Sequence, residues 1–397
     1  MINIILSALI GSFLGVITGI IPGVHVNLLA TIIVALSGLY LGVFSPLTIS
    51  IFILAIAISH TFCKAIPATF LGVAEENTIF NLLPSHKMLL EGKGYEAVKL
   101  TIIGSLFGAV AIILISPLLL ISIDKVYPII KNYIPYLLII SSLFLIYKEK
   151  FRSWAFVIFI ISGIFGILTF NVPNIKEVLL PMLSGLFGLS SILLSLKDKI
   201  KVSKQEINKE KIKDLNLPKS IGIGLIASLL VGFLPGLGSA QGAAIATSMS
   251  KKISTKATLV ILGSIDTIIM IMSIIAFYSI ERARSGAIVA ITRFIPKFDV
   301  NTIILFMGVT LLSAGISSII TLYATRFIAN KISKLNYKKI GIIVSIFIVL
   351  LVTIVSGPLG LFILLISTII GTLPVFFKVS RSQLMGCLII PVIIYLI

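Results

Sequence analysis

"GIIPGVHVNL" (residues 19–28) and "GFLPGLGSAQ" (residues 232–241) are two Pro-Gly breaks inside long apolar runs. Proline lacks the backbone N–H that a helix interior needs, and glycine lets the chain turn. Each run, 3–41 and 220–249, is therefore predicted to be a hairpin of two half-helices that enters and leaves the membrane by the same face. These two hairpins decide how the rest of the chain can be arranged.

The composition is typical of a protein embedded in a lipid bilayer. Of the 397 residues, 58% are hydrophobic and 12% are charged, and the mean hydropathy is +1.19. Backbone groups in lipid must be hydrogen-bonded within their own segment, so the predicted fold class is all-α, a polytopic transmembrane helical protein. Cys63 and Cys387 lie far apart in apolar segments and predict neither a disulfide framework nor a metal site.

Further apolar runs follow each hairpin and set the predicted topology. The basic residues, which give a net charge of +18, crowd the loops between runs as in cytoplasmic loops, and this placement argues against a nucleic-acid partner. With five spans after each hairpin, the strongly basic loops all face the cytoplasm. Both termini are then outside, in a multi-pass protein of the cytoplasmic (plasma) membrane. The spans are 46–71, 98–122, 133–147, 152–170 and 178–196, then 257–280, 300–325, 340–356, 358–377 and 382–397.

The two halves of the chain repeat the same order of features. Each begins with a Pro-Gly hairpin, continues with one span and a polar interruption (72–97 and 281–299), and ends with four more spans. Because five spans is an odd number, the halves have opposite orientations, which is the plan of many secondary transporters. The sequence therefore predicts a first inverted repeat at 1–196, a cytoplasmic basic linker at 197–219 and a second inverted repeat at 220–397.

The two breaks predict an anion site near the middle of the membrane. Half-helices that begin at Pro-Gly turns present positive dipole ends and free backbone N–H groups, which suit a carboxylate or a phosphate. The alternative is a pair of kinks without a site, because proline and glycine are common in membrane helices. For His25, packing between helices is nearly as good an explanation as ligand binding. The predicted substrate-binding residues are Pro22, Gly23, His25, Asn27, Pro235, Gly236, Gly238, Ser239 and Gln241.

Three polar residues inside spans form a second predicted group. His60 and Lys64 lie in the span after the first hairpin, and Asp266 lies in the matching span of the second half. A charged side chain inside a span is costly and usually faces a cavity or a partner. Lys64 is therefore predicted to pair with Asp266, which could exchange the lysine for Na⁺ or H⁺ as a coupling ion. The alternative is that Lys64 extends to the cytoplasmic interface.

Four segments of the chain are distinctive: "GVITGIIPGVHVNLLATII" (15–33), "HKMLLEGKGYEAVKLTIIGSLFGAV" (86–110), "LLVGFLPGLGSAQGAAIATSMSKK" (229–252) and "VSRSQLMGCLIIPVII" (379–394). They resemble the TctA family, the large membrane subunit of tripartite tricarboxylate transporters. The resemblance is to a divergent, shorter member, in which His25 and Asn27 stand where the family usually has small residues. It implies a solute permease for di- or tricarboxylates that works with a small membrane subunit and a soluble binding protein, or, in a divergent branch, without them.

The predicted function is that of a secondary-transporter-like permease for a small organic anion, bound at the midplane and moved by alternating access. No cofactor is expected apart from Na⁺ or H⁺ as a coupling ion, membrane lipid is the expected surrounding partner, and a homodimer is left open. The alternative function is a translocase for an anionic lipid carrier such as polyprenyl phosphate. An enzyme is not expected, because the chain has no HExxH, no GxSxG and no pair of intramembrane aspartates.

Overall fold

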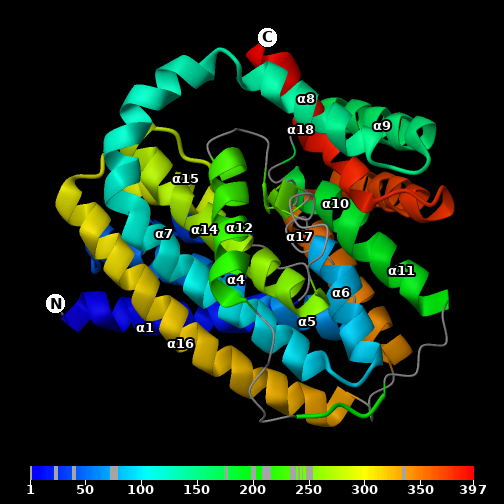
Figure 1. The fold of residues 1–397 in the computed structure, drawn as a ribbon, viewed down its shortest axis with the longest axis horizontal. Helices are drawn as coiled ribbons and strands as arrows, with labels where there is room; N and C mark the ends of the chain where they lie inside the picture. The colour runs from blue at the N-terminus through cyan, green and yellow to red at the C-terminus, as the bar shows by residue number, and fades with distance from the viewer. Residues whose placement is uncertain are drawn as a thin grey trace.

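The computed structural model is built from helices in the part of the chain that it describes (Figure 1). Seven of the described helices are long and apolar enough to cross a membrane, and shorter apolar helices accompany them. The prediction of a polytopic helical membrane protein is confirmed. The described residues are 2–21, 26–37, 42–71, 79–173, 175, 178–197, 203–207, 216–232, 238–239, 242–243, 245–246, 254–332 and 337–397.

The elements of the two halves follow one another in a similar order, and the predicted polar interruptions each contain a short helix, α6 or α15. The first half contains α1 (Ile2–Ile20), α2 (Val26–Ala35), α4 (Pro46–Cys63), α5 (Ala65–Phe70), α6 (Ile79–Leu90), α7 (Gly94–Lys131), α8 (Ile134–Tyr147), α9 (Arg152–Phe170), α10 (Leu179–Leu183), the π-helical η2 (Ser184–Leu189) and α11 (Ser190–Lys197). The second half contains α12 (Leu217–Gly232), α14 (Thr255–Ile280), α15 (Gly286–Phe294), α16 (Val300–Ile332), α17 (Tyr337–Phe376), the 3₁₀ helix η3 (Arg381–Met385) and α18 (Gly386–Leu396).

Helices α1 and α4 run parallel to each other in close contact. Gly11 of α1 lies against Phe52 of α4, and Gly19 lies against Cys63, so the residue numbers rise together along the two helices. Small residues at such spacing let membrane helices approach closely. Because α1 and α4 point the same way, residues 21–45 must carry the chain back to the side where α1 began, as the predicted hairpin requires.

Helix α16 of the second half joins α1 and α4 in the same direction. The Ser12 and Ser313 hydroxyls lie 3.0 Å apart, and farther along the Cys63 thiol lies 2.7 Å from the Thr321 hydroxyl. The numbers rise together here as well, so α16 is parallel to the other two. We call α1, α4 and α16 the first trio.

Helices α12 and α14 repeat the parallel arrangement in the second half. Gly224 of α12 lies against Ser264 of α14, and Gly232 lies against Met272. The residues between α12 and α14, which contain the second Pro-Gly break, therefore also return the chain to the side where α12 began.

Helix α7 of the first half packs along α14 in the same direction. Gly104 lies against the backbone of Val260, and Gly108 lies against Ser264, so the two helices are parallel. The four-residue spacing of these glycines brings the two backbones into contact. We call α7, α12 and α14 the second trio.

The two trios run in opposite directions. Helix α7 begins beside the end of α5, where Gly94 contacts Phe70. Helix α16 begins near the end of α14, where the Phe298 ring lies 4.6 Å from Phe277 and 5.2 Å from Phe306. Figure 1 shows α7 and α16 running past each other in opposite senses. Each trio thus combines two helices of one half with one long helix of the other.

The first arm of the first hairpin differs from its prediction. Helix α1 has 19 residues, which corresponds to about 28 Å and is long enough to cross the hydrocarbon core. The prediction of a half-helix is therefore wrong for this arm, because the small-residue face of α1 packs on α4 along most of its length. The returning arm, α2, has 10 residues.

The predicted spans 340–356 and 358–377 form a single element, α17, with a break between them. The break is at Gly357, whose φ of 67° and ψ of −164° are not helical, and Pro358 follows it. Glycine adopts this backbone conformation without a steric penalty. Helices α9, α10, η2 and α11 pack against α17, and α8 and α18 pack against α9. The Trp154 ring of α9 stacks on the Phe377 ring at 3.9 Å.

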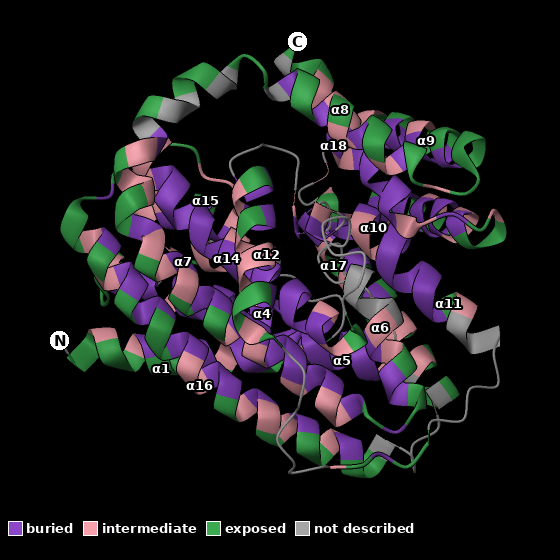
Figure 2. Cartoon of the chain, viewed as in Figure 1, coloured by how far each residue is buried: buried purple, intermediate pink, exposed green. Residues whose placement is uncertain are grey.

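The centre of the molecule is formed by α4, α5 and α14. In the most apolar 18-residue windows of the Pro46–Phe70 and Thr255–Ile280 segments, 89% and 94% of the residues are buried, against 22% in α17. In Figure 2 the colour for buried residues predominates in the middle of the bundle, and the colour for exposed residues is commoner at its periphery. Any polar group on their facing sides is therefore shielded from lipid by the surrounding helices.

Candidate functional site

The helical run of α4 and α5 is interrupted where it carries its one charged side chain. Pro67 has no N–H to donate to the carbonyl of Cys63, four residues earlier, and this loss favours a helix break. Lys64 occupies the junction: its N–H donates to the His60 carbonyl at 3.1 Å, and its own carbonyl accepts from Ala68 at 3.2 Å. The break thus places an ammonium group inside the bundle.

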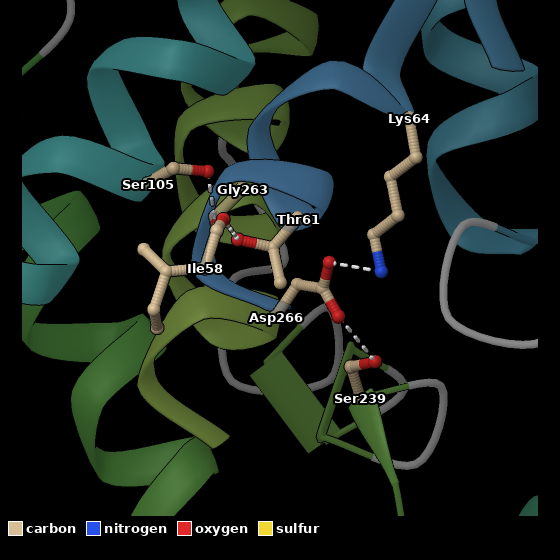
Figure 3. Close-up of polar contacts among 7 residues, drawn as sticks. All are labelled: Ile58, Thr61, Lys64, Ser105, Ser239, Gly263 and Asp266. Atoms are coloured by element: carbon tan, nitrogen blue, oxygen red, sulfur yellow. Dashed lines mark hydrogen bonds and ion pairs between the residues drawn. The ribbon is translucent and has the colours of Figure 1, made fainter. Parts of the chain in front are cut away.

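Lys64 and Asp266 form an ion pair between α4 and α14 (Figure 3). The two side chains are only 5% and 9% exposed. The Ser239 hydroxyl donates a hydrogen bond of 3.1 Å to the other carboxylate oxygen of Asp266. The sequence pairs Lys64 with Asp266, and the structure places them together; it also adds Ser239, so both carboxylate oxygens have a partner.

Burial makes the two charges depend on each other. An isolated charge is expensive in a medium of low polarity, whereas a close pair of opposite charges is neutral overall. Among the ion pairs seen in the described parts of the chain, this one alone has both side chains less than a tenth exposed. A third charged species near Asp266 would therefore have to compete with the lysine.

Ser239 connects this pair to the second Pro-Gly break. It follows Pro235-Gly236 by three residues, and the Gly238 carbonyl accepts a hydrogen bond of 3.2 Å from the Gly242 N–H, so a helical turn begins there. A movement of this segment would be transmitted directly to a carboxylate oxygen of Asp266. The geometry therefore joins two residue groups that the sequence treats separately.

The other predicted residues are placed only in part. His60 is buried on α4, one turn before Lys64. The backbone of Asn27 lies in the first turn of α2, directly after the first break. The approach of the two Pro-Gly turns to each other stays a prediction, because Pro22, Gly23, His25, Pro235, Gly236 and Gln241 lie outside the described residues.

Sequence reasoning missed a set of buried hydroxyl groups on the helices of the bundle. Ser59 of α4 and Thr267 of α14 are buried, and in the described structure neither hydroxyl oxygen has a hydrogen-bond partner. Thr310 and Ser317 on α16 share this property. Hydroxyl groups can donate and accept, so they could hydrogen-bond to water or coordinate an ion within the bundle. Isolated Ser and Thr residues in an otherwise apolar run are the sequence signal that could have found them.

Asp266 is the carboxylate that could bind a cation within the central helices. In the portion of the chain that is described, no group of three or more His, Cys, Asp and Glu side chains is arranged to hold a metal ion. A monovalent cation at Asp266 would have to replace the Lys64 ammonium and complete its shell with hydroxyl or carbonyl oxygens. A proton would need only the carboxylate itself.

Comparison with known proteins agrees with this architecture. The model of the tripartite tricarboxylate transporter TctA family matches residues 5–386. An uncharacterized protein of Methanocaldococcus jannaschii is 33% identical over 405 aligned residues, which include 100% of this chain and 99% of that protein. No solved structure matches the chain. The family match spans nearly the whole chain, so this protein belongs to the tripartite tricarboxylate transporter TctA family.

Proposed function

We propose that this protein is a secondary transporter for a small organic anion of the di- or tricarboxylate class, coupled to Na⁺ or H⁺. The observation that carries the proposal is the buried Lys64–Asp266 pair, in which the second Asp266 carboxylate oxygen accepts a hydrogen bond from Ser239 of the second Pro-Gly segment. A coupled transporter can use a buried group whose charge is exchanged during the cycle, and the burial of this neutral pair supports such a role. A purely structural ion pair would not need the Pro-Gly segment as a third partner.

The arrangement of the helices supports alternating access by inverted repeats. We infer that residues 1–196 and 220–397 are the two repeats, because the trios exchange corresponding helices between the halves and run in opposite directions. In known transporters of this plan, the substrate lies between the repeats and one repeat rocks against the other. The positive-inside rule then places both termini outside.

The chemistry of a transport cycle follows from three charges. The substrate carboxylate approaches the backbone N–H groups of the Pro-Gly segments and attracts the Lys64 ammonium. Asp266, left without its cation, takes up Na⁺ or H⁺ and stays neutral overall while the substrate is bound. Release of substrate and ion on the other side lets Lys64 return to Asp266. When Asp266 binds or releases its cation, the strength of its hydrogen bond with Ser239 changes, and this change reaches the Pro-Gly segment.

The test is uptake by the purified full chain in liposomes with an imposed Na⁺ or H⁺ gradient. Radiolabelled citrate and succinate are the probes, and Asp266→Asn is expected to abolish gradient-driven accumulation. Glu96→Gln, which also neutralises one acidic group beside α14, is the matched control and should keep full accumulation. Size-exclusion profiles of both variants show whether they fold. Gradient-driven accumulation by Asp266→Asn at the wild-type level would contradict the coupling role.

Ser239→Ala tests the link to the Pro-Gly segment. It is expected to lower uptake strongly while changing the stability by only about 1 kcal/mol, the usual contribution of one hydrogen bond. Ser142→Ala is the control, since Ser142 is also buried but donates only to the Leu138 carbonyl of its own helix at 2.8 Å. Equal uptake in the two variants would remove Ser239 from the mechanism.

The accessory proteins and the cargo are tested in the same liposomes. Uptake by the chain alone would indicate a solo carrier, and uptake only after addition of a soluble binding protein and a small membrane subunit would indicate a tripartite system. Movement of a labelled polyprenyl phosphate between leaflets without any citrate or succinate uptake would favour the lipid-carrier alternative over the organic-anion proposal.

A further inference from the structure

A basic cleft lies between the α6–α7 turn of the first half and the start of α14. Its volume is about 360 Å³, and three lysines contribute to its wall. The cleft is remote along α14 from Asp266, so it is separate from the site described above. The lining residues are Lys87, Met88, Glu91, Lys93, Ser254, Thr255 and Lys256.

The cleft lies at the level where two helices enter the membrane. Helices α7 and α14 are parallel and begin side by side, and the Lys256 ammonium of α14 lies 2.7 Å from the Glu96 carboxylate of α7. The apolar runs of these helices begin at residues 98 and 257. A ligand in this cleft would therefore be at the depth of lipid headgroups, just outside the hydrocarbon core.

The linker between the halves fixes the turn that forms one wall of the cleft. The Gln205 side chain accepts a hydrogen bond from the Gly94 N–H at 2.8 Å and donates one to the Leu89 carbonyl at 3.0 Å. The Glu206 N–H donates to the Gly92 carbonyl at 2.7 Å, and Gly92 has a φ of 81°, which favours glycine. Because Gln205 is only 7% exposed, these bonds are shielded from water. These bonds fix this wall of the cleft before any ligand binds.

The charges of the cleft are incompletely neutralised. Lys93 lies 3.9 Å from Glu91, and both side chains are nearly half exposed, so this pair is weak. The Lys256 ammonium forms an ion pair with the Glu96 carboxylate. Within the described residues no carboxylate pairs with Lys87. The N-terminal end of α14, a helix of 26 residues, adds a partial positive charge at the same place.

We propose that this cleft binds the phosphate group of an anionic membrane lipid. Three ammonium groups, two hydroxyl residues and the positive end of a helix suit a phosphate diester. Inorganic phosphate shares this chemistry, but a headgroup is favoured because the cleft lies at headgroup depth. The proposal does not depend on the cargo or on the coupling ion.

The test measures the thermal unfolding midpoint of the detergent-purified full chain as phosphatidylglycerol is titrated in. The midpoint should rise with phosphatidylglycerol and stay unchanged with phosphatidylcholine. The double variant Lys87→Gln, Lys93→Gln should bind phosphatidylglycerol about 25-fold more weakly, since each lysine near a membrane surface contributes about fivefold. Both side chains are exposed, so the variant is expected to fold.

The matched control is Lys148→Gln, Lys150→Gln, which removes two exposed lysines from the turn between α8 and α9. This control should respond to phosphatidylglycerol as the wild type does. An equal loss of response in the two double variants, or no loss in either, would overturn the proposal. A response to inorganic phosphate as large as that to phosphatidylglycerol would also overturn it, in favour of a soluble phosphate ligand.

Discussion

Two ion pairs connect α14 to the first half of the chain, one buried and the other partly exposed to solvent. Lys64–Asp266 lies in the centre, with side chains 5% and 9% exposed. Lys256–Glu96 lies at the end of the bundle, with side chains 40% and 19% exposed. The two α14 residues are ten positions apart, which corresponds to about 15 Å along the helix. The same chemistry is thus placed at two depths.

The difference in depth changes what each pair can do. Water near the outer pair screens its charges and solvates either partner when the other is absent. The inner pair has no water to solvate an unpaired charge, so the loss of one partner must be compensated by a proton, an ion or another charged group. The inner pair is therefore suited to a transport cycle, and the outer one to holding two helix ends together.

The largest effect is expected when the inner pair is broken on one side. Lys64→Met leaves the Asp266 carboxylate buried without its cation, which should lower the free energy of unfolding by about 3–5 kcal/mol. The measurement is unfolding of the detergent-solubilised protein by sodium dodecyl sulfate, followed by circular dichroism. The double variant Lys64→Met, Asp266→Asn is the control, because it leaves no charge at this place.

The double variant should regain most of the lost stability but show no ion-coupled uptake. Regained stability without uptake would show that the two charges are required for transport and not for folding. If the double variant were as unstable as Lys64→Met, the cost would come from lost packing around Lys64 rather than from an unpaired charge. If Lys64→Met were as stable as the wild type, the pair would not be desolvated as its burial indicates.

A smaller effect is expected from the close contact between α7 and α14, which lies between the inner and outer pairs along α14. A Cβ atom at Gly104 would overlap the Val260 carbonyl of α14. Gly104→Ala should therefore push α7 from α14 and cost about 1–3 kcal/mol, the usual range for overpacking. Gly308→Ala is the control on α16, where nothing lies within 4 Å of the added atom; it should be neutral or slightly stabilising. Unfolding in sodium dodecyl sulfate measures both, and equal stability of the two variants would contradict the close packing.

Much of the inner region could be predicted from the sequence, for a simple physical reason. Charged residues inside apolar runs are rare, so few other residues could neutralise Lys64 or Asp266 within the membrane. The Pro-Gly breaks likewise predict that the chain turns back, and the parallel course of α1 with α4 and of α12 with α14 agrees with this. These signals are local, and they do not depend on which helices become neighbours.

The outer region could not be predicted in the same way. Glycines four residues apart, such as Gly104 and Gly108, indicate a close helix contact without saying which helix is the partner. The packing of α7 with two helices of the second half, and of α16 with two of the first, depends on which helix each one contacts, and the glycine spacing does not specify this. Gln205 lies in a polar, lysine-rich linker, where nothing in its surroundings marks it as buried. Its hydrogen bonds with Leu89 and Gly94 exist only once the linker lies against the α6–α7 turn.

The smallest effect is expected at the outer pair. Glu96→Gln, Lys256→Gln and the double variant form a mutant cycle, in which the coupling energy should be below about 1 kcal/mol because both partners are partly solvated. Raising the ionic strength from 0.05 to about 0.5 M should reduce this coupling further, since the Debye length then falls below 10 Å. A coupling as large as the cost of Lys64→Met would mean that α7 and α14 bury this pair as deeply as the inner one. The contrast in depth between the two pairs would then no longer account for their roles.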